Sequence, residues 1–317
     1  MALALGCGGV LALRRSQALS GALFGLLIIK PHLALLVPFW LAASRKWTAM
    51  AAAAAKLKVP TDIALKDPKT WTIAGKPLPR LDTVAKTTGA QVYGMDLQLP
   101  GMFNAAIRDC PVVGGKVKSF DASKAKGMPG VIDVVQVADS VAVVATSYWQ
   151  AQKARKALTV QWDEGAGASL TTAAMFESTR AASKSGTALP LKAVGDADAV
   201  IAASQNVVRA EYASQNVSHS PLEPMNFTAH VQGDKILLIG PTQFQQGAQG
   251  ATAAALGMKP EDVDVRTTYL GGGFGRRIEL DFISQAVQVS KAVGRPVKVL
   301  WSREDDMKHD FYRPAGL

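Results

Sequence analysis

Hydrophobic and polar positions divide this sequence into a continuous apolar stretch and a longer region of short elements. Residues 18–43 are almost entirely apolar, and a helix of that length can cross a bilayer core of about 30 Å. β-branched runs bounded by turn residues predict short strands at 131–137, 141–146, 158–162, 235–240, 264–270 and 297–301. Helical spacing predicts helices at 147–158, 246–256 and 282–293. Together these patterns predict an α+β fold that follows an N-terminal hydrophobic helix.

The apolar stretch is an imperfect membrane span. Lys30, Pro31 and His32 lie in its middle, where a charge costs about 2.5 to 3.5 kcal/mol on insertion scales and a proline interrupts the hydrogen-bond ladder. A signal peptide would begin with its positive region, whereas residues 1–13 carry no charged side chain. The stretch resembles one loop and helix of a multi-spanning membrane glycosyltransferase that uses lipid-linked sugars. We therefore assign residues 1–50 to a hydrophobic, membrane-like segment.

Composition excludes several kinds of site. The 35 Lys and Arg against 25 Asp and Glu give a formal charge of +10, which suits an anionic partner or a phosphorylated cofactor. No lysine-rich run is interleaved with aromatic residues, which argues against nucleic-acid binding. Cys7 and Cys110 are the only cysteines, too few for the four thiolates of an iron–sulfur cluster. The four histidines do not have zinc-ligand spacing, so we predict no metal-ligating side chains.

Turn residues and composition predict how the rest of the chain is organised. Residues 51–80, with alanines first and prolines and charges after them, predict a linker. The strands and the helix between residues 81 and 165 predict a compact α+β unit. A second unit is assigned to residues 166–317, and its first part, as far as residue 199, is rich in small residues and predicts a connection.

The sequence YLGGGFGRR, at residues 269–277, lies between a predicted strand and a predicted helix. Consecutive glycines allow positive φ and bring several N–H groups close to a ligand, where a phosphate or an oxo group can accept hydrogen bonds. The run is not a Walker loop and lacks the spacing of a dinucleotide fingerprint. Glycine-rich turns between strand and helix are common, so the glycines alone leave an ordinary turn as the alternative.

Three motifs in this chain resemble a known family. GGGFGRR is similar to the molybdopterin-binding loop of the xanthine dehydrogenase and aldehyde oxidase superfamily. With PLEPMNFTAHV at residues 221–231 and SREDDMKHDFYRPAG at residues 302–316, it resembles the beta subunit of isoquinoline 1-oxidoreductase and its relatives. The linker and the sequence that opens the first unit follow the same order. The resemblance implies an α/β-hammerhead domain at 81–165 and an incomplete molybdopterin-binding domain at 166–317.

The resemblance also implies a cofactor site. The loop backbone would contact the pterin dithiolene and the metal oxo group, Arg276 would bind the cofactor's phosphates, and Gln243 would lie near the cofactor or at a solvent-facing strand end. The implied cofactor-binding residues are Gly271, Gly272, Gly273, Phe274, Gly275, Arg276 and Gln243. Glu223 and Asn226 would support the pocket or serve only the fold, and His219 is a weaker candidate. Val217 stands where purine hydroxylases carry a glutamine, which argues against purine oxidation.

The implied reaction is hydroxylation of an N-heterocycle or an aldehyde with water as the oxygen source. In the family, a glutamate near the C-terminal end of the large subunit acts as the base, and this chain ends before it, so no catalytic residue is assigned and the chain alone is expected to be inactive. We read the whole as a fusion or a misassembled gene, and expect a membrane-associated or periplasmic location.

The implied cofactor is molybdenum–molybdopterin in the cytosine dinucleotide form. The implied partners are a small subunit with [2Fe–2S] clusters and an electron acceptor such as a cytochrome. The alternatives are a membrane-tethered binding or assembly module, and a fragment of a membrane glycosyltransferase.

Overall fold

The computed structural model describes residues 64–185, 192 and 194–316. The chain divides into two compact units, Met1–Pro79 and Arg80–Leu317. In the first unit, the 3-10 helix η2 (Pro68–Thr70) begins after Asp67, whose carboxylate accepts a hydrogen bond from the Lys69 N–H at 2.9 Å. In the part of the chain that the structure describes, no helix is long and apolar enough to span a membrane. The apolar stretch at residues 18–43 lies outside that part.

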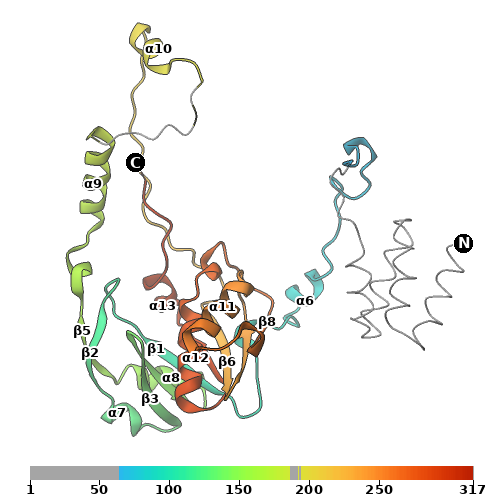
Figure 1. The fold of residues 1–317 in the computed structure, drawn as a ribbon, viewed down its shortest axis with the longest axis vertical. Helices are drawn as coiled ribbons and strands as arrows, with labels where there is room; N and C mark the ends of the chain where they lie inside the picture. The colour runs from blue at the N-terminus through green and yellow to red at the C-terminus, as the bar shows by residue number, and fades with distance from the viewer. Residues whose placement is uncertain (1–63, 186–191, 193, 317) are drawn as a thin grey trace, which may run out of the picture. The chain divides into compact units, whose positions relative to one another are not determined.

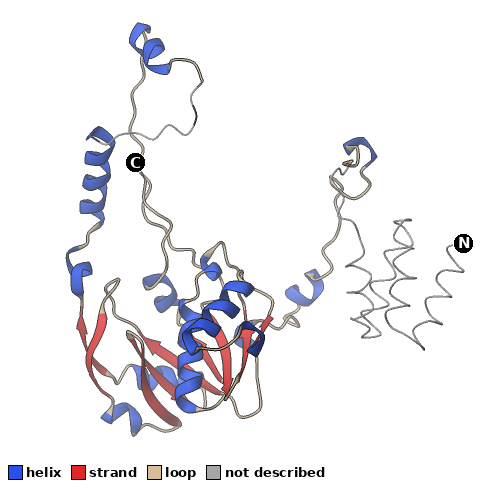
Figure 2. Ribbon diagram, viewed as in Figure 1, coloured by secondary structure: helices blue, strands red, loops and turns tan. Residues whose placement is uncertain are grey.

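The second unit is built on a seven-stranded mixed sheet (Figure 2). In spatial order its strands are β3 (Val131–Val137), β4 (Ser140–Ala145), β1 (Phe103–Arg108), β9 (Val297–Leu300), β6 (Asn226–Gln232), β7 (Lys235–Gly240) and β8 (Val263–Thr267). The pairs β1–β9 and β7–β8 are parallel, and the other neighbours are antiparallel. Because β9 lies between β1 and β6, strands far apart in the sequence share one sheet. The α+β class is thereby confirmed, and the domain boundary at residue 165 stays a prediction.

The strands predicted at residues 131–137 and 141–146 correspond to β3 and β4, whereas β1 and β6 were not among the predicted strands. β3 and β4 form a hairpin in which Val137 pairs with Ser140, and Ala138 in the turn has a φ of 47°. The helix α8 (Tyr148–Arg155) begins after Ser147, whose hydroxyl caps it. A separate two-stranded sheet pairs β2 (Lys116–Asp121) with β5 (Thr159–Asp163), and α7 (Ser123–Lys126) lies between β2 and β3 in the sequence. A small apolar cluster joins these elements, made by Ala125, Val134, Val141, Val143, Ala154 and Leu158.

Two helices cover the other half of the sheet. α11 (Gln245–Leu256) packs against β8, and α12 (Asp281–Val293) packs against β6 and β9 (Figure 1). Each ends at a glycine in the left-handed region, Gly257 and Gly294, as the sequence predicts. Phe227 of β6 and Phe282 of α12 meet edge to face with ring centroids 5.9 Å apart in the main core.

The segment predicted as a connection contains helices that the sequence analysis missed. α9 (Thr172–Ser185) and α10 (Ala197–Ala203) bury none of their described residues, so no apolar stripe marked them. The remaining short elements are α6 (Thr83–Thr87), η3 (Gly94–Asp96), η4 (Gly165–Ser169), η5 (Pro260–Asp262), η6 (Arg276–Ile278) and α13 (Arg303–Lys308).

Strand directions bring four chain segments to one edge of the sheet. Thr228 near the start of β6 pairs with Ile239 near the end of β7, and Gly240 pairs with Thr267 at the end of β8. Asn226 pairs with Leu300 at the end of β9. The residues that precede β6 and those that follow β7, β8 and β9 therefore lie close together, and they include the glycine loop.

Candidate functional site

The glycine loop follows β8 and leads into η6 and α12. Gly272 and Gly275 have φ values of 102° and 104°, and Phe274 between them has a φ of 55°. Gly273 does not have a positive φ. A bulky residue in the left-handed region is uncommon and is held only where the surroundings determine it. Phe274 also leaves 62% of its surface exposed, so burial of its ring does not explain the conformation.

Within the described part of the chain, three consecutive N–H groups of the loop are left available to a ligand. The Gly271 N–H donates to Glu223 Oε2 at 2.8 Å, and the Gly275 N–H donates to Gln243 Oε1 at 3.1 Å. Among the residues that the structure describes, the N–H groups of Gly272, Gly273 and Phe274 have no acceptor. Alternation of positive and negative φ turns successive N–H groups toward one side and makes a concavity that binds anions or oxo groups. We name Gly271–Gly275 the cradle.

Two cradle glycines are required by close contacts. A Cβ on Gly271 would lie 2.4 Å from the Cβ of Glu223, and one on Gly273 would lie 2.5 Å from Gln243 Oε1. Any other residue at either position would push a supporting side chain away from the loop.

Glu223 joins the cradle to the segment before β6. Its Oε1 accepts hydrogen bonds from the Met95 N–H at 3.2 Å and from Asn226 Nδ2 at 2.9 Å, while Oε2 accepts from Gly271. The Glu223 N–H donates in turn to the Gly271 carbonyl at 2.9 Å. The structure thus brings Glu223 and Asn226 together with the loop, in supporting positions. Asn226 Oδ1 is buried and has no partner among the described residues.

Arg277 is a site residue to which the sequence analysis gave no role. Its fully buried side chain donates from Nε to the Gly272 carbonyl at 2.8 Å and from the NH2 nitrogen to the Glu223 carbonyl at 2.7 Å. The same nitrogen lies 3.3 Å from Glu223 Oε2. Burial lowers the pKa of Arg277 to about 10, against the opposite effect of the Glu223 carboxylate. Two arginines directly after a glycine turn and before an apolar helix were the signal that could have revealed it.

Arg276 points into the protein instead of toward a ligand. Its guanidinium makes two hydrogen bonds with Asp281, at 2.9 and 2.7 Å, and its Nε lies 3.1 Å from Asp310. Although burial opposes its charge, the neighbouring carboxylates raise the pKa of Arg276. Its Cζ lies 5.2 to 5.7 Å from three aromatic ring centroids, those of Phe311, Trp301 and Phe282. The side chain is fully buried. Arg276 therefore offers no accessible donor for the contact with cofactor phosphates that the sequence analysis expected.

His219 lies near Gly275 of the cradle and contacts Asp310. His219 Nδ1 is 3.0 Å from Asp310 Oδ1, and the Ser218 hydroxyl donates to Oδ2 at 2.7 Å. Burial alone would raise the pKa of Asp310, but the hydrogen bonds from Ser218 and His219 outweigh it and the pKa lies below its ordinary value. A Cβ on Gly275 would lie 3.8 Å from His219 Nε2. The residues around Asp310 therefore connect the C-terminal segment to the loop.

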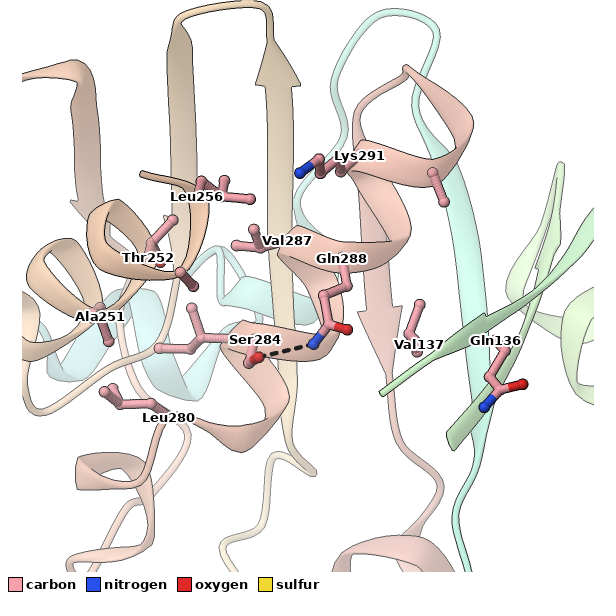
Figure 3. Close-up of a pocket in the computed structure, with 14 residues that line it drawn as sticks. Gln136, Val137, Ala251, Thr252, Leu256, Leu280, Ser284, Val287, Gln288 and Lys291 are labelled. Carbon is pink, nitrogen blue, oxygen red and sulfur yellow. Dashed lines mark hydrogen bonds between the residues drawn. The ribbon is translucent and has the colours of Figure 1, made fainter. Parts of the chain in front are cut away.

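A groove of about 630 Å³ lies elsewhere, between α11 and α12 (Figure 3). Ala251, Leu256, Leu280 and Val287 give it apolar walls, and Lys291 lies on it. It contains none of the predicted site residues. Within the described ranges, no group of three or more His, Cys, Asp or Glu side chains could hold a metal ion. The cradle, with its free N–H groups, is therefore the candidate site.

Two family models match parts of this chain. Residues 182–315 match the family model of the molybdopterin cofactor-binding domain, and residues 1–61 match that of glycosyltransferase family 87. The chain is 32% identical over 263 residues to the isoquinoline 1-oxidoreductase subunit beta of Brevundimonas diminuta, an alignment that covers 80% of this chain and 34% of that protein. It is 31% identical over 262 residues to a membrane-bound aldehyde dehydrogenase of Gluconacetobacter polyoxogenes, whose name includes pyrroloquinoline quinone, over 77% of this chain and 33% of that protein.

A solved structure shares the fold. Quinoline 2-oxidoreductase from Pseudomonas putida 86 superimposes with a TM-score of 0.58 at 23% identity, over 73% of this chain and 35% of that one. The chain spans about one third of the length of these relatives. The family model and the relatives point the same way: the chain belongs to the molybdenum hydroxylase family and carries a molybdopterin cofactor-binding domain of its large subunit.

Proposed function

We propose that the cradle binds the molybdopterin cofactor of a molybdenum-dependent oxidoreductase. The observation that carries this proposal is the row of three N–H groups, of Gly272, Gly273 and Phe274, without an acceptor among the described residues. They lie at a sheet edge inside the residues that match the cofactor-binding domain.

The chemistry of the cradle fits such a cofactor. Backbone N–H groups donate to oxo and phosphate oxygens without adding a charge, and glycines let the ligand approach the backbone closely. Gln243 Oε1 already accepts from Gly275, and its Nε2, which has no acceptor in the described part of the chain, is a further donor for the cofactor.

The proposed substrates are N-heterocycles or aldehydes, in keeping with the names of the relatives. When bound, the cofactor supplies the metal at which substrate is oxidised, with water as the oxygen source. This chain's residues position the cofactor, and we assign no catalytic base among them. Val217, with 55% of its surface exposed and its backbone paired to Arg313, offers no amide side chain for purine recognition.

The cytosine dinucleotide form of the cofactor and an α/β-hammerhead arrangement of residues 81–165 belong to the same proposal. So do a small [2Fe–2S] subunit and an acceptor such as a cytochrome. Cys110 is buried and is the only cysteine within the described residues. Since an iron–sulfur cluster needs four thiolates, we place it on the proposed small subunit.

Molybdenum and pterin content test the proposal directly. The full chain would be purified from a bacterial host that makes molybdopterin, and both components would be measured per chain. Gly273→Ala places a methyl group against Gln243 and should lower the molybdenum content at least about tenfold, since a loss of about 1.4 kcal/mol in binding already gives that factor. A wild-type chain without molybdenum, or one that contains pyrroloquinoline quinone, would refute the proposal.

Gly250→Ala is the matched control. Gly250 lies within α11 and a Cβ there meets nothing within 4 Å. The substitution should leave the molybdenum content unchanged and should stabilise the helix by a few tenths of a kcal/mol up to about 1 kcal/mol. Equal molybdenum loss in both variants would show that the effect of Gly273→Ala does not arise at the cradle.

A further inference from the structure

The direction of each free N–H group in the cradle is set by the carbonyl that precedes it. A trans peptide is planar, and its C=O and N–H point in opposite directions. The Gly271 carbonyl accepts from the Glu223 N–H at 2.9 Å, and the Gly273 carbonyl accepts from the Arg276 N–H at 2.8 Å. These two contacts turn the Gly272 N–H away from Glu223 and the Phe274 N–H away from the Arg276 N–H.

The central N–H group, that of Gly273, depends on a side chain. Its peptide partner is the Gly272 carbonyl, which accepts from Arg277 Nε at 2.8 Å. The other two carbonyls are held by backbone donors, so Arg277 is the one side chain among the three anchors.

Arg277 also connects the loop to the segment before β6 and to the end of β7. Its NH2 nitrogen donates to the Glu223 carbonyl at 2.7 Å, and its NH1 nitrogen lies 3.4 Å from the Pro241 carbonyl at the end of β7. Three carbonyls around one buried cation use the planar fork of guanidinium donors, an arrangement that an ammonium group cannot reproduce.

We propose that Arg277 is a positioning residue, which directs the Gly273 N–H toward the bound cofactor by holding the Gly272 carbonyl. The part of this inference that concerns the cofactor rests on the function proposed above. The part that concerns the loop does not, because the carbonyl contacts exist in the chain itself.

Hydrogen-exchange mass spectrometry of the full chain without cofactor tests the loop. Arg277→Met keeps most of the apolar stem and removes the donors. We expect the peptide that contains residues 269–278 to lose about tenfold or more in protection, because a hydrogen bond to a charged group contributes about 1.5 to 3 kcal/mol. The peptide that contains β7 should keep its protection. Arg266→Met, at an exposed arginine paired with Asp264, is the matched control and should change neither peptide.

Molybdenum content then tests the link to the cofactor. Under limiting cofactor, Arg277→Met should hold about tenfold less molybdenum than the wild type, by the same hydrogen-bond estimate, while Arg266→Met holds as much. A wild-type chain that binds no molybdenum would refute the proposed function, yet loosening of the loop in Arg277→Met would still support the positioning of the loop. Wild-type protection of the loop in Arg277→Met would overturn the inference.

If Arg277→Met does not fold, Arg277→Lys provides a second test of the same inference. Lysine keeps the charge beside Glu223 but not the fork, so we expect exchange to increase in the loop and not in β7. If the lysine variant exchanges like the wild type, or loses protection in β7 as well, a local role for the guanidinium fork is excluded.

Discussion

Two neighbouring arginines that follow the glycine loop are buried to the same extent and are held in different ways. Arg276 has carboxylates as partners, Asp281 and Asp310, and aromatic rings around its Cζ. Arg277 has backbone carbonyls as its main partners, with the Glu223 carboxylate at 3.3 Å. Burial alone therefore does not indicate the role of a charged residue. The kind of acceptor that holds it, carboxylate or backbone carbonyl, does indicate that role.

The two surroundings predict different consequences of losing the charge. On the Arg276 side, removal of the cation leaves carboxylates without their partner in a largely apolar place, so the cost falls on the stability of the whole unit. On the Arg277 side, removal releases carbonyls whose peptides form the cradle, so the cost falls on the geometry of the loop.

Arg276→Met should have the largest effect on stability. We expect the free energy of unfolding to fall by about 3 to 5 kcal/mol, the cost of breaking a buried ion pair by removing one partner. Urea denaturation followed by circular dichroism measures it, with Arg266→Met as the exposed control. A loss no greater than that of Arg277→Met would break the comparison, since both arginines would then serve the fold alike.

The sequence predicted the glycine loop and much of the sheet, because both follow from local patterns. The strand at residues 131–137 needed only a β-branched run, and the helix ends at Gly257 and Gly294 needed only a left-handed glycine. The position of β9 between β1 and β6 depends on pairing between distant segments, which no local pattern contains.

The partners of Arg276 could not be predicted for a similar reason. The donors of an arginine beside a glycine loop suit phosphate, and only the fold shows that Asp310, more than thirty residues later in the sequence, lies beside the Nε of Arg276. The glycines of the loop are adjacent in sequence, but the contacts of Gly271 with Glu223 and of Gly273 with Gln243 also depend on the fold.

Asp310→Asn should have an intermediate effect that depends on pH. The folded pKa of Asp310 lies below its ordinary value of 3.8. Its stabilising contribution is therefore complete above that value and is lost as the pH falls through the folded pKa. The variant should lose about 1 to 3 kcal/mol at neutral pH and should show a shallower fall in stability on acidification. Urea denaturation at neutral and acidic pH measures both, and an unchanged acid dependence would contradict the role of Asp310.

Phe274→Gly should have the smallest effect on stability. It therefore separates the stability of the fold from binding at the loop. Glycine adopts a φ of 55° without the steric cost that phenylalanine carries, but it loses more backbone entropy on folding. Because 62% of the Phe274 surface is exposed, little packing is lost, and we expect a change in the free energy of unfolding within about 1 kcal/mol. Thermal unfolding of the two chains measures it. A larger loss would show that the ring supports the loop. An unchanged stability with reduced molybdenum content would instead show that the strained phenylalanine is kept for the ligand, because only the bound state would then depend on it.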